Sequence, residues 1–242
     1  MNSLSGLIQR LLRGPELIVT SQETALSLAR LGGKVENIPQ VPVGEGLNRL
    51  FAMRRAEAES IADQLPECPS LEAPLLHLYD EIYQAFIFGL NGTAIILSGV
   101  LVEFAVKYAS YCREVGGKVE FDSEKWKEFE ERLTLGPAID RAKRNGLIAE
   151  DQAMKLHEFA REVRNSYAHF NIQKQTAGAI FRGVRVRNIH TGEEETKDIP
   201  ASALPALQIL AKAKLDTQKA LPLFLFADGV VRHLHPVDEP ER

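Results

Sequence analysis

The stretch from Thr93 to Glu114 is apolar on nearly every side of a helix, and no other stretch limits the possible folds as strongly. A helix that is apolar all round has to be buried on all sides. Other helices must therefore surround it, so we expect a mainly α protein built as a helical bundle around this segment. The composition, with 45% apolar and 26% charged residues, is that of an ordinary soluble globular protein.

A membrane span is the alternative for this part of the chain, because no residue from Ala85 to Val102 is charged. Gly89 and the pair Asn91-Gly92 interrupt the stretch in its middle, and its second half continues amphipathically through Glu103 and Lys107. No excess of basic residues flanks it. The sequence therefore favours a buried helical hairpin, and we expect no membrane partner.

Shifts in composition and clusters of turn residues divide the chain into four parts. The clearest boundary is the segment Pro66-Glu67-Cys68-Pro69. Before it, Leu17–Val19 predicts a short strand, and two helices are expected, one after Thr20 and one from Leu47 to Leu65. The four expected parts are an N-terminal helical appendage (1–66), a helical bundle (67–175), a β-hairpin (176–200), and a C-terminal helix that completes the bundle and ends in a tail (201–242).

Capping and turn residues predict where the helices of the bundle begin and end. Small polar residues favour helix starts, and Asn-Gly pairs and Gly-Pro pairs favour turns or breaks. The predicted boundaries are Ser70 as an N-cap, Asn91-Gly92 as the turn into the central helix, Asp122 or Ser123 as the start of a third helix, Gly136-Pro137 as its break or restart, and Asn145-Gly146 as its end.

The C-terminal third combines a basic strand with a last apolar helix. The strand carries Arg182, Arg185 and Arg187, and Thr191-Gly192 predicts the turn of the hairpin. A two-residue turn would put Arg185 and Arg187 on one face with acidic residues of the second strand, so cross-strand ion pairing is favoured over contact with RNA. The acidic strand's residues on that face are Glu194, Thr196 and Asp198, and the last helix is expected from Ser202 to Phe226, with a polar tail after Asp228.

One further helix, expected from Glu150 to Asn171, carries the candidate chemistry. Its apolar stripe consists of Leu156, Phe159, Ala160, Val163, Tyr167 and Phe170, and Glu158, Glu162, Asn165 and His169 fall on another stripe. The last turns carry Arg161, Arg164 and His169. Arg is a permanently charged, forked donor suited to phosphate oxygens, and His exchanges protons near neutral pH.

Arg164 and His169 together suit cleavage of RNA, because RNA carries its own nucleophile, the 2′-hydroxyl. A base takes the proton of that hydroxyl, a cation stabilises the phosphate, and an acid protonates the leaving oxygen, all without a metal. One His cannot easily hold both proton roles, whereas two copies facing each other across a dimer can.

The alternative is that Arg164 and His169 only complement the dipole at the C-terminal end of the helix. Asn165 and Ser166 would then be polar residues without a specific role, and Tyr167 would be a core aromatic residue with its hydroxyl at the surface. From the spacing alone this alternative is favoured, because Arg and His five residues apart occur often by chance.

The motif Arg164-Asn165-Ser166-Tyr167-Ala168-His169, at the end of the last core helix of a bundle, resembles that of the HEPN superfamily: Arg, a polar residue, three variable residues and His. The Asn91-Gly92 hairpin, the Gly146-Leu147-Ile148 turn and Glu103 in the central helix are similar as well. The resemblance covers about residues 70–175, with the helix after Ser202 as a closing element.

The resemblance implies an all-α bundle, homodimerisation through the 150–171 helices, and metal-independent endoribonuclease activity without a cofactor. Such proteins act in toxin–antitoxin, phage-defence and RNA-processing systems, so an antitoxin or regulatory protein is a further expected partner. The resemblance implies catalysis by Arg164 and His169, with Glu103 near the site. We further expect support from Asn165 and Tyr167, and contact with RNA by Arg161 and Arg144.

Other features bear on these expectations. Asn171 stands where toxins paired with a nucleotidyltransferase antitoxin have Tyr, which does not favour that partner. The net charge is −4, but residues 137–174 hold seven Lys and Arg against five Asp and Glu. Two scarce cysteines and the absence of an early secretory signal indicate the cytoplasm. The open alternatives are a non-catalytic module that binds nucleotide, RNA or a protein, and an interaction protein that uses its apolar helix faces.

Overall fold

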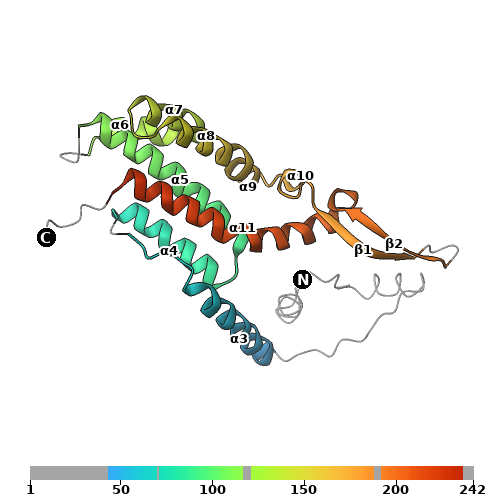
Figure 1. Cartoon of the computed structure of the whole chain (residues 1–242). Helices are drawn as coiled ribbons and strands as arrows, with labels where there is room; N and C mark the ends of the chain where they lie inside the picture. The colour runs from blue at the N-terminus through green and yellow to red at the C-terminus, as the bar shows by residue number, and fades with distance from the viewer. Residues whose placement is uncertain (1–42, 70, 117–120, 188–191, 237–242) are drawn as a thin grey trace.

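The computed structural model describes residues 43–69, 71–116, 121–187 and 192–236, and these are mainly α-helical with one small β-hairpin (Figure 1). The prediction of a mainly α fold with an inserted hairpin is confirmed. The central helix is α5 (Asn91–Glu114), whose residues Leu101, Val102 and Val106 are fully buried. The helices that pack against it are α4 (Ala73–Ile87), α7 (Leu135–Arg144) and α11 (Pro205–Leu234).

The remaining elements connect and extend this bundle. Two short stretches are π-helices, in which the hydrogen bonds span five residues instead of four. In chain order the elements are α3 (Val43–Ala62), α6 (Ser123–Lys127), the π-helix η1 (Glu128–Arg132), α8 (Glu150–Phe159), the π-helix η2 (Ala160–Arg164), α9 (Asn165–Ala168), α10 (Ile172–Gln175), β1 (Ile180–Arg187), β2 (Glu194–Pro200) and the 3-10 helix η3 (Ala201–Ala203).

The helix α3 is the described part of the predicted N-terminal appendage, and it extends from one end of α4 (Figure 1). Phe51 and Met53 of this helix are 59% and 45% exposed, so its apolar side is only partly covered by the bundle. The strand predicted at Leu17–Val19 and the helix predicted after Thr20 lie outside the described residues.

One helix of the described part, α5, is long and apolar enough to cross a membrane by length and composition alone. However, 56% of its most apolar window is buried inside the protein, as in the core helix of a soluble bundle. This burial agrees with the predicted helical hairpin.

The turn between α4 and α5 lies at Gly89 and not at Asn91-Gly92, so that predicted boundary is wrong. Gly89 has φ +65°, a conformation that glycine adopts readily. Gly92 belongs to the first turn of α5, where a Cβ would lie 2.9 Å from Oδ2 of Asp216 on α11. Gly92 therefore serves close packing between helices, which the Asn-Gly pattern does not reveal.

Two helix ends also differ from the prediction. The helix α4 begins at Ala73 after Glu72, and not after Ser70. At the other end of the chain, α11 begins at Pro205 and continues to Leu234, beyond the expected end at Phe226. Asp228 does not begin a polar tail, because its buried carboxylate accepts a hydrogen bond from the Tyr79 hydroxyl (2.7 Å).

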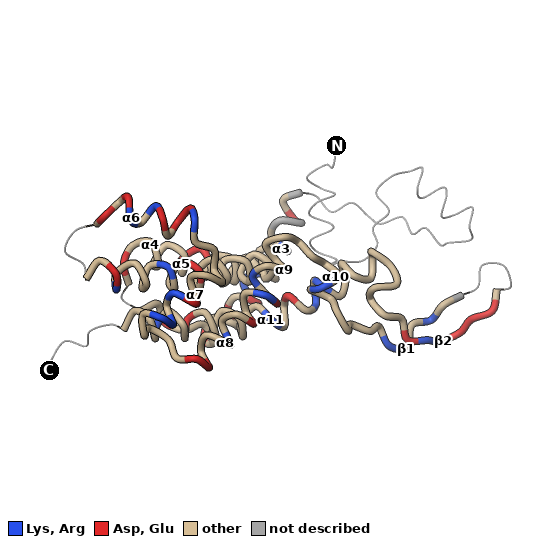
Figure 2. The backbone as a smooth tube through the Cα atoms, turned by 90° about the horizontal axis from the view of Figure 1, so that it is seen from above, with Lys and Arg blue, Asp and Glu red and all other residues tan. Residues whose placement is uncertain are grey.

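The hairpin pairs Arg185 with Thr196 and Arg187 with Glu194, which keeps the predicted faces but shifts the predicted register by two residues. The predicted turn includes Thr191, which lies outside the described residues. Basic residues of β1 run beside acidic residues of β2 (Figure 2). Even so, Arg185 has no ion-pair partner within the described ranges, so the expected cross-strand ion pair of this residue is not formed.

Candidate functional site

The candidate motif lies on one continuous helical segment, made of α8, η2 and α9, with a wide π-helical turn in its middle. The backbone N–H of Asn165 donates to the carbonyl of Ala160, five residues earlier. The Ser166 hydroxyl donates to the carbonyls of Glu162 (2.6 Å) and Val163 (3.0 Å) within this turn. Single π-helical turns inside α-helices are frequent at functional sites, and this one ends at Arg164, the first residue of the motif.

The helical segment ends at His169, earlier than the expected end at Asn171. The N–H of Asn171 donates to the Ser166 carbonyl (2.8 Å), and the N–H of Phe170 donates to the Tyr167 carbonyl (3.1 Å), which is the Schellman arrangement of helix ends. Phe170 has φ +47° and is 66% exposed. The predicted apolar stripe therefore stops at Tyr167, because the chain turns Phe170 out of the helix.

Arg164 is held against the central helix by Glu103. Its Nε and Nη2 atoms lie 2.9 Å and 2.7 Å from the same carboxylate oxygen, Oε2. The other oxygen, Oε1, pairs with Nζ of Lys107 one turn further along α5 (2.8 Å). The Glu103 and Lys107 side chains are only 15% and 11% exposed, and that of Arg164 is 30% exposed. Glu103 thus pairs with two cations and orients the guanidinium.

A glycine in α5 allows the motif helix to approach this closely. A Cβ built at Gly99 would lie 3.2 Å from Cγ and 3.6 Å from Cα of Arg164. The contact with Cγ is tighter than side chains normally make, whereas that with Cα is ordinary van der Waals contact, so a larger residue at this position would require the Arg164 side chain to shift. Gly99 and Glu103 lie four residues apart and therefore face the same side of α5.

Asn165 and His169 complete the end of the motif helix. The Asn165 side chain accepts a hydrogen bond from Nη1 of Arg164 (3.3 Å), and the Asn165 carbonyl accepts one from the N–H of His169 (3.1 Å). His169 is exposed, and in the described part of the chain its imidazole has no hydrogen-bond or ion-pair partner. The structure thus brings Arg164, Glu103 and Asn165 into contact and leaves His169 open to solvent one turn further on.

Tyr167 faces away from this group, toward α11. Its hydroxyl donates to Oδ1 of Asp216 (2.6 Å), and burial together with this hydrogen bond raises the pKa of Tyr167 well above its ordinary value. The Lys212 ammonium lies 4.9 Å from the ring centre and also pairs with Asp216. The alternative interpretation placed this hydroxyl at the surface, which is wrong: the hydroxyl is buried and connects the motif helix to α11.

The two proposed RNA-contacting arginines lie in different places. Arg161 is exposed beside the motif, and its Nε bonds to Glu162 (2.7 Å), which lowers the pKa of that carboxyl group. Lys174 donates to the Arg161 carbonyl (2.8 Å) and adds a cation that the sequence analysis did not single out. Arg144 ends α7, next to the start of α8, and roughly 28 Å of helix separates that point from His169. The fold therefore does not bring Arg144 to the motif.

No group of three His, Cys, Asp or Glu residues within the described ranges could hold a metal ion. The closest pair of histidines in the sequence is His233 and His235, and their imidazoles bond to different carbonyls, those of Leu147 and Ala105 (both 3.1 Å). They do not form a chelating pair.

Comparison of the chain with models of known protein families, with curated proteins and with solved structures gives no match. The chemistry of the site therefore has to be argued from its own geometry.

The roles of Lys107, Gly99 and Phe170 at the site were not predicted from the sequence. The sequence does contain a signal for Lys107, because it lies four residues after Glu103 in an otherwise apolar helix, and this spacing favours an ion pair. The close contact at Gly99 and the backbone conformation of Phe170 have no signal in a single sequence, because each depends on how two segments pack. Chemically, the site offers an oriented guanidinium that is partly open to solvent and an exposed imidazole near the same helix end.

Proposed function

We propose that this protein is a cytoplasmic, metal-independent endoribonuclease of HEPN type that acts as a homodimer. The observation that supports this most is the contrast between the two motif residues. Arg164 is oriented by a buried carboxylate on a neighbouring helix, whereas His169 is exposed and has no partner among the described side chains. Simple complementation of a helix dipole requires neither the buried Glu103 nor an unpartnered imidazole.

In the proposed reaction, His169 takes the proton from the RNA 2′-hydroxyl, whose oxygen then attacks the adjacent phosphate. Arg164 stabilises the negative charge on the phosphate oxygens through the donors that Glu103 leaves open. The His169 of the second copy donates a proton to the leaving 5′-oxygen. The products are a 2′,3′-cyclic phosphate and a free 5′-hydroxyl, so no oxidant, water or metal ion takes part in this step.

The surface of the motif helix supports association of two copies. Met154 on α8 and Phe170 at the helix end are 60% and 66% exposed, and Ile96 and Val100 on the neighbouring face of α5 are 43% and 42% exposed. Apolar side chains that remain exposed along and beside one helix favour burial against another protein surface. A two-fold axis at the motif helix would place both copies of His169 near one site.

The test is a cleavage assay on mixed single-stranded and structured RNA in EDTA, with variants matched in type and location. Arg164→Ala and His169→Ala should each lower the rate by about 100-fold or more, since a lost proton-transfer or phosphate-binding group costs about that much. His157→Ala is the control, because His157 is another histidine on the same helical segment and pairs with Asp140 (2.9 Å). Equal rates for His169→Ala and His157→Ala would contradict the proposal.

A second candidate function is a non-catalytic module that binds nucleotide, RNA or a protein partner such as an antitoxin. It is favoured by one observation: Nε and Nη2 of Arg164 bond to Glu103, and Nη1 bonds to Asn165, so every guanidinium nitrogen already has a protein acceptor. Binding of RNA lacking the reactive 2′-hydroxyl, without cleavage of ordinary RNA, would support this function over the first.

A further inference from the structure

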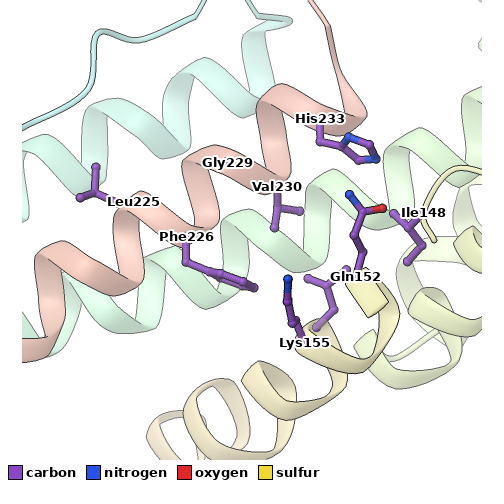
Figure 3. A pocket seen from close by; sticks show the side chains of 9 residues that line it. Ile148, Gln152, Lys155, Leu225, Phe226, Gly229, Val230 and His233 are labelled. Atoms are coloured by element: carbon purple, nitrogen blue, oxygen red, sulfur yellow. The ribbon is translucent and has the colours of Figure 1, made fainter. Parts of the chain in front are cut away.

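A cleft of about 250 Å³ lies between α8 and α11 (Figure 3), and neither Arg164 nor His169 is among the residues that line it. Its walls are mostly apolar: Ile148 and Leu156 are buried on one side, and Phe226 and Val230 line the other. A single benzene fills an apolar cavity of about 150 Å³, so this cleft has room for a ligand of about ten non-hydrogen atoms.

One of the residues of α11 that line the cleft is a glycine, Gly229. A Cβ built at Gly229 would meet nothing within 4 Å, so no neighbouring atom excludes a larger residue. Glycine is also a poor helix former, and here it lies inside a 30-residue helix. Neither contacts with the described residues nor backbone conformation requires a glycine at this position, and a larger side chain here would take up space in the cleft that Gly229 lines.

Three polar side chains line the cleft: Gln152 and Lys155 offer free donors, whereas Nε2 of His233 already donates to the Leu147 carbonyl (3.1 Å). The Lys155 side chain is 67% exposed and lies at the mouth together with Gln152 (Figure 3). The Gln152 Oε1 atom accepts the N–H of Ala149 (2.8 Å), so the oxygen is used and the amide N–H groups remain as donors. No carboxylate is among the residues that line the cleft; the nearest acidic partner of Lys155 is Asp151, at 3.8 Å.

We propose that this cleft binds a small amphiphilic carboxylate, of which octanoate, with ten non-hydrogen atoms, is the size match. The aliphatic chain lies between Leu156 and Phe226, and the carboxylate receives hydrogen bonds from Lys155 and Gln152. The apolar walls fit the aliphatic chain of the ligand. The free donors of Lys155 and Gln152, with no carboxylate among the lining residues, favour a negatively charged head group. This proposal is independent of the proposed nuclease activity.

The experiment is calorimetric titration of the full-length protein with octanoate and with 1-octanol, which lacks the charge. A ligand of this size in an open cleft should bind octanoate with a Kd of about 0.1–1 mM. Gly229→Leu fills the cleft and should weaken octanoate binding by about tenfold or more. Gly136→Leu is the matched control, because Gly136 is a helical glycine with equally open space that does not line the cleft. Lys155→Gln should weaken octanoate binding and leave octanol binding unchanged.

Thermal unfolding of each variant shows whether it is folded, and Gly229→Ala provides a smaller change that should weaken binding less. Saturable binding that Gly229→Leu and Lys155→Gln weaken in this way would support the site. The proposal is overturned if octanoate does not bind saturably, or if folded Gly229→Leu binds it as tightly as the native protein. It is also overturned if Gly229→Leu dissociates an oligomer, since the cleft would then be an interface between copies.

Discussion

Replacing Glu103 with Gln tests whether this carboxylate holds the candidate site together. The substitution keeps the size of the side chain but removes the charge that Arg164 and Lys107 share. Lys107 would remain as an unpaired ammonium in a site that is almost closed to water, and Arg164 would lose the acceptor that orients it.

The expected loss follows from the burial of the three side chains. Breaking a fully buried ion pair by removing one partner costs about 3–5 kcal/mol. Arg164 is 30% exposed, and the long stem of Lys107 lets its ammonium move toward water, so the cost should lie at or below the lower end of that range. We expect a loss of about 2–3 kcal/mol, which for a domain of this size lowers the Tm by roughly 4–12 °C.

The assay is thermal and urea unfolding followed by far-ultraviolet circular dichroism. Glu59→Gln is the control, because Glu59 forms an exposed pair with Arg55 on α3 and its loss should not be measurable. Adding Lys107→Met to Glu103→Gln should recover part of the loss, since the stranded ammonium is then gone. The reasoning is refuted if Glu103→Gln unfolds at the same temperature as Glu59→Gln.

Three further changes test other parts of the structure. Phe170→Gly should raise the free energy of unfolding by up to about 1 kcal/mol, because φ +47° strains a residue with a Cβ; urea unfolding would show whether it does. The hydrogen bond from Arg141 lowers the pKa of the Glu114 carboxyl group in the folded protein. The ionised carboxylate therefore stabilises the folded protein at pH values above its unfolded-state pKa of about 4.3, and this stabilisation is lost as the pH falls through the folded-state pKa. Glu114→Gln should therefore make the unfolding free energy less dependent on pH between about pH 5 and 3, and an unchanged slope would contradict this. Tyr167→Phe removes the buried hydrogen bond to Asp216 and should cost about 1–2 kcal/mol, without changing the cleavage rate of folded protein.

The parts of the fold that depend on nearby residues were predictable from the sequence. Asp122 was expected to begin a helix, and its side chain accepts the N–H of Lys125 (3.0 Å) as an N-cap does. Asn145-Gly146 was expected to end a helix, and Gly146 has φ +70° directly after α7. In both cases the signal and its structural effect lie within four residues of each other.

The predictions that were wrong concern residues whose partners lie far away in the sequence. Gly92 was interpreted as a turn residue, but its role is close contact with Asp216 on α11. Asp228 was interpreted as the start of a polar tail, but Tyr79 and Arg232 satisfy its carboxylate inside the bundle. A single sequence shows that a residue is small or charged, but not which distant side chain it meets.

The relative positions of Arg164 and His169 also depend on how the helices are wound and packed. The π-helical turn ends at Arg164, so the chain from Arg164 to His169 is close to a regular helix, and five residues rotate a side chain by about 140°. Arg164 accordingly packs toward Glu103 and Gly99 of α5, whereas His169 is exposed. In a regular helix the side chains of Arg164 and His169 in one copy therefore point in different directions, which is why we expect the site to combine two copies.

Mixing wild-type protein with His169→Ala protein, under conditions that let dimers exchange, tests this expectation. If each site needs the His169 of both copies, an equal mixture should show about half the activity of the same amount of wild type alone, because half of the wild-type chains then pair with a variant chain. A ninefold excess of the variant should leave about a tenth of the activity that the same amount of wild type shows alone. Activity that stays constant during the titration, while size-exclusion chromatography confirms mixed dimers, would show that each copy cleaves RNA independently. The proton roles would then have to be carried by one His169 and a group outside the motif.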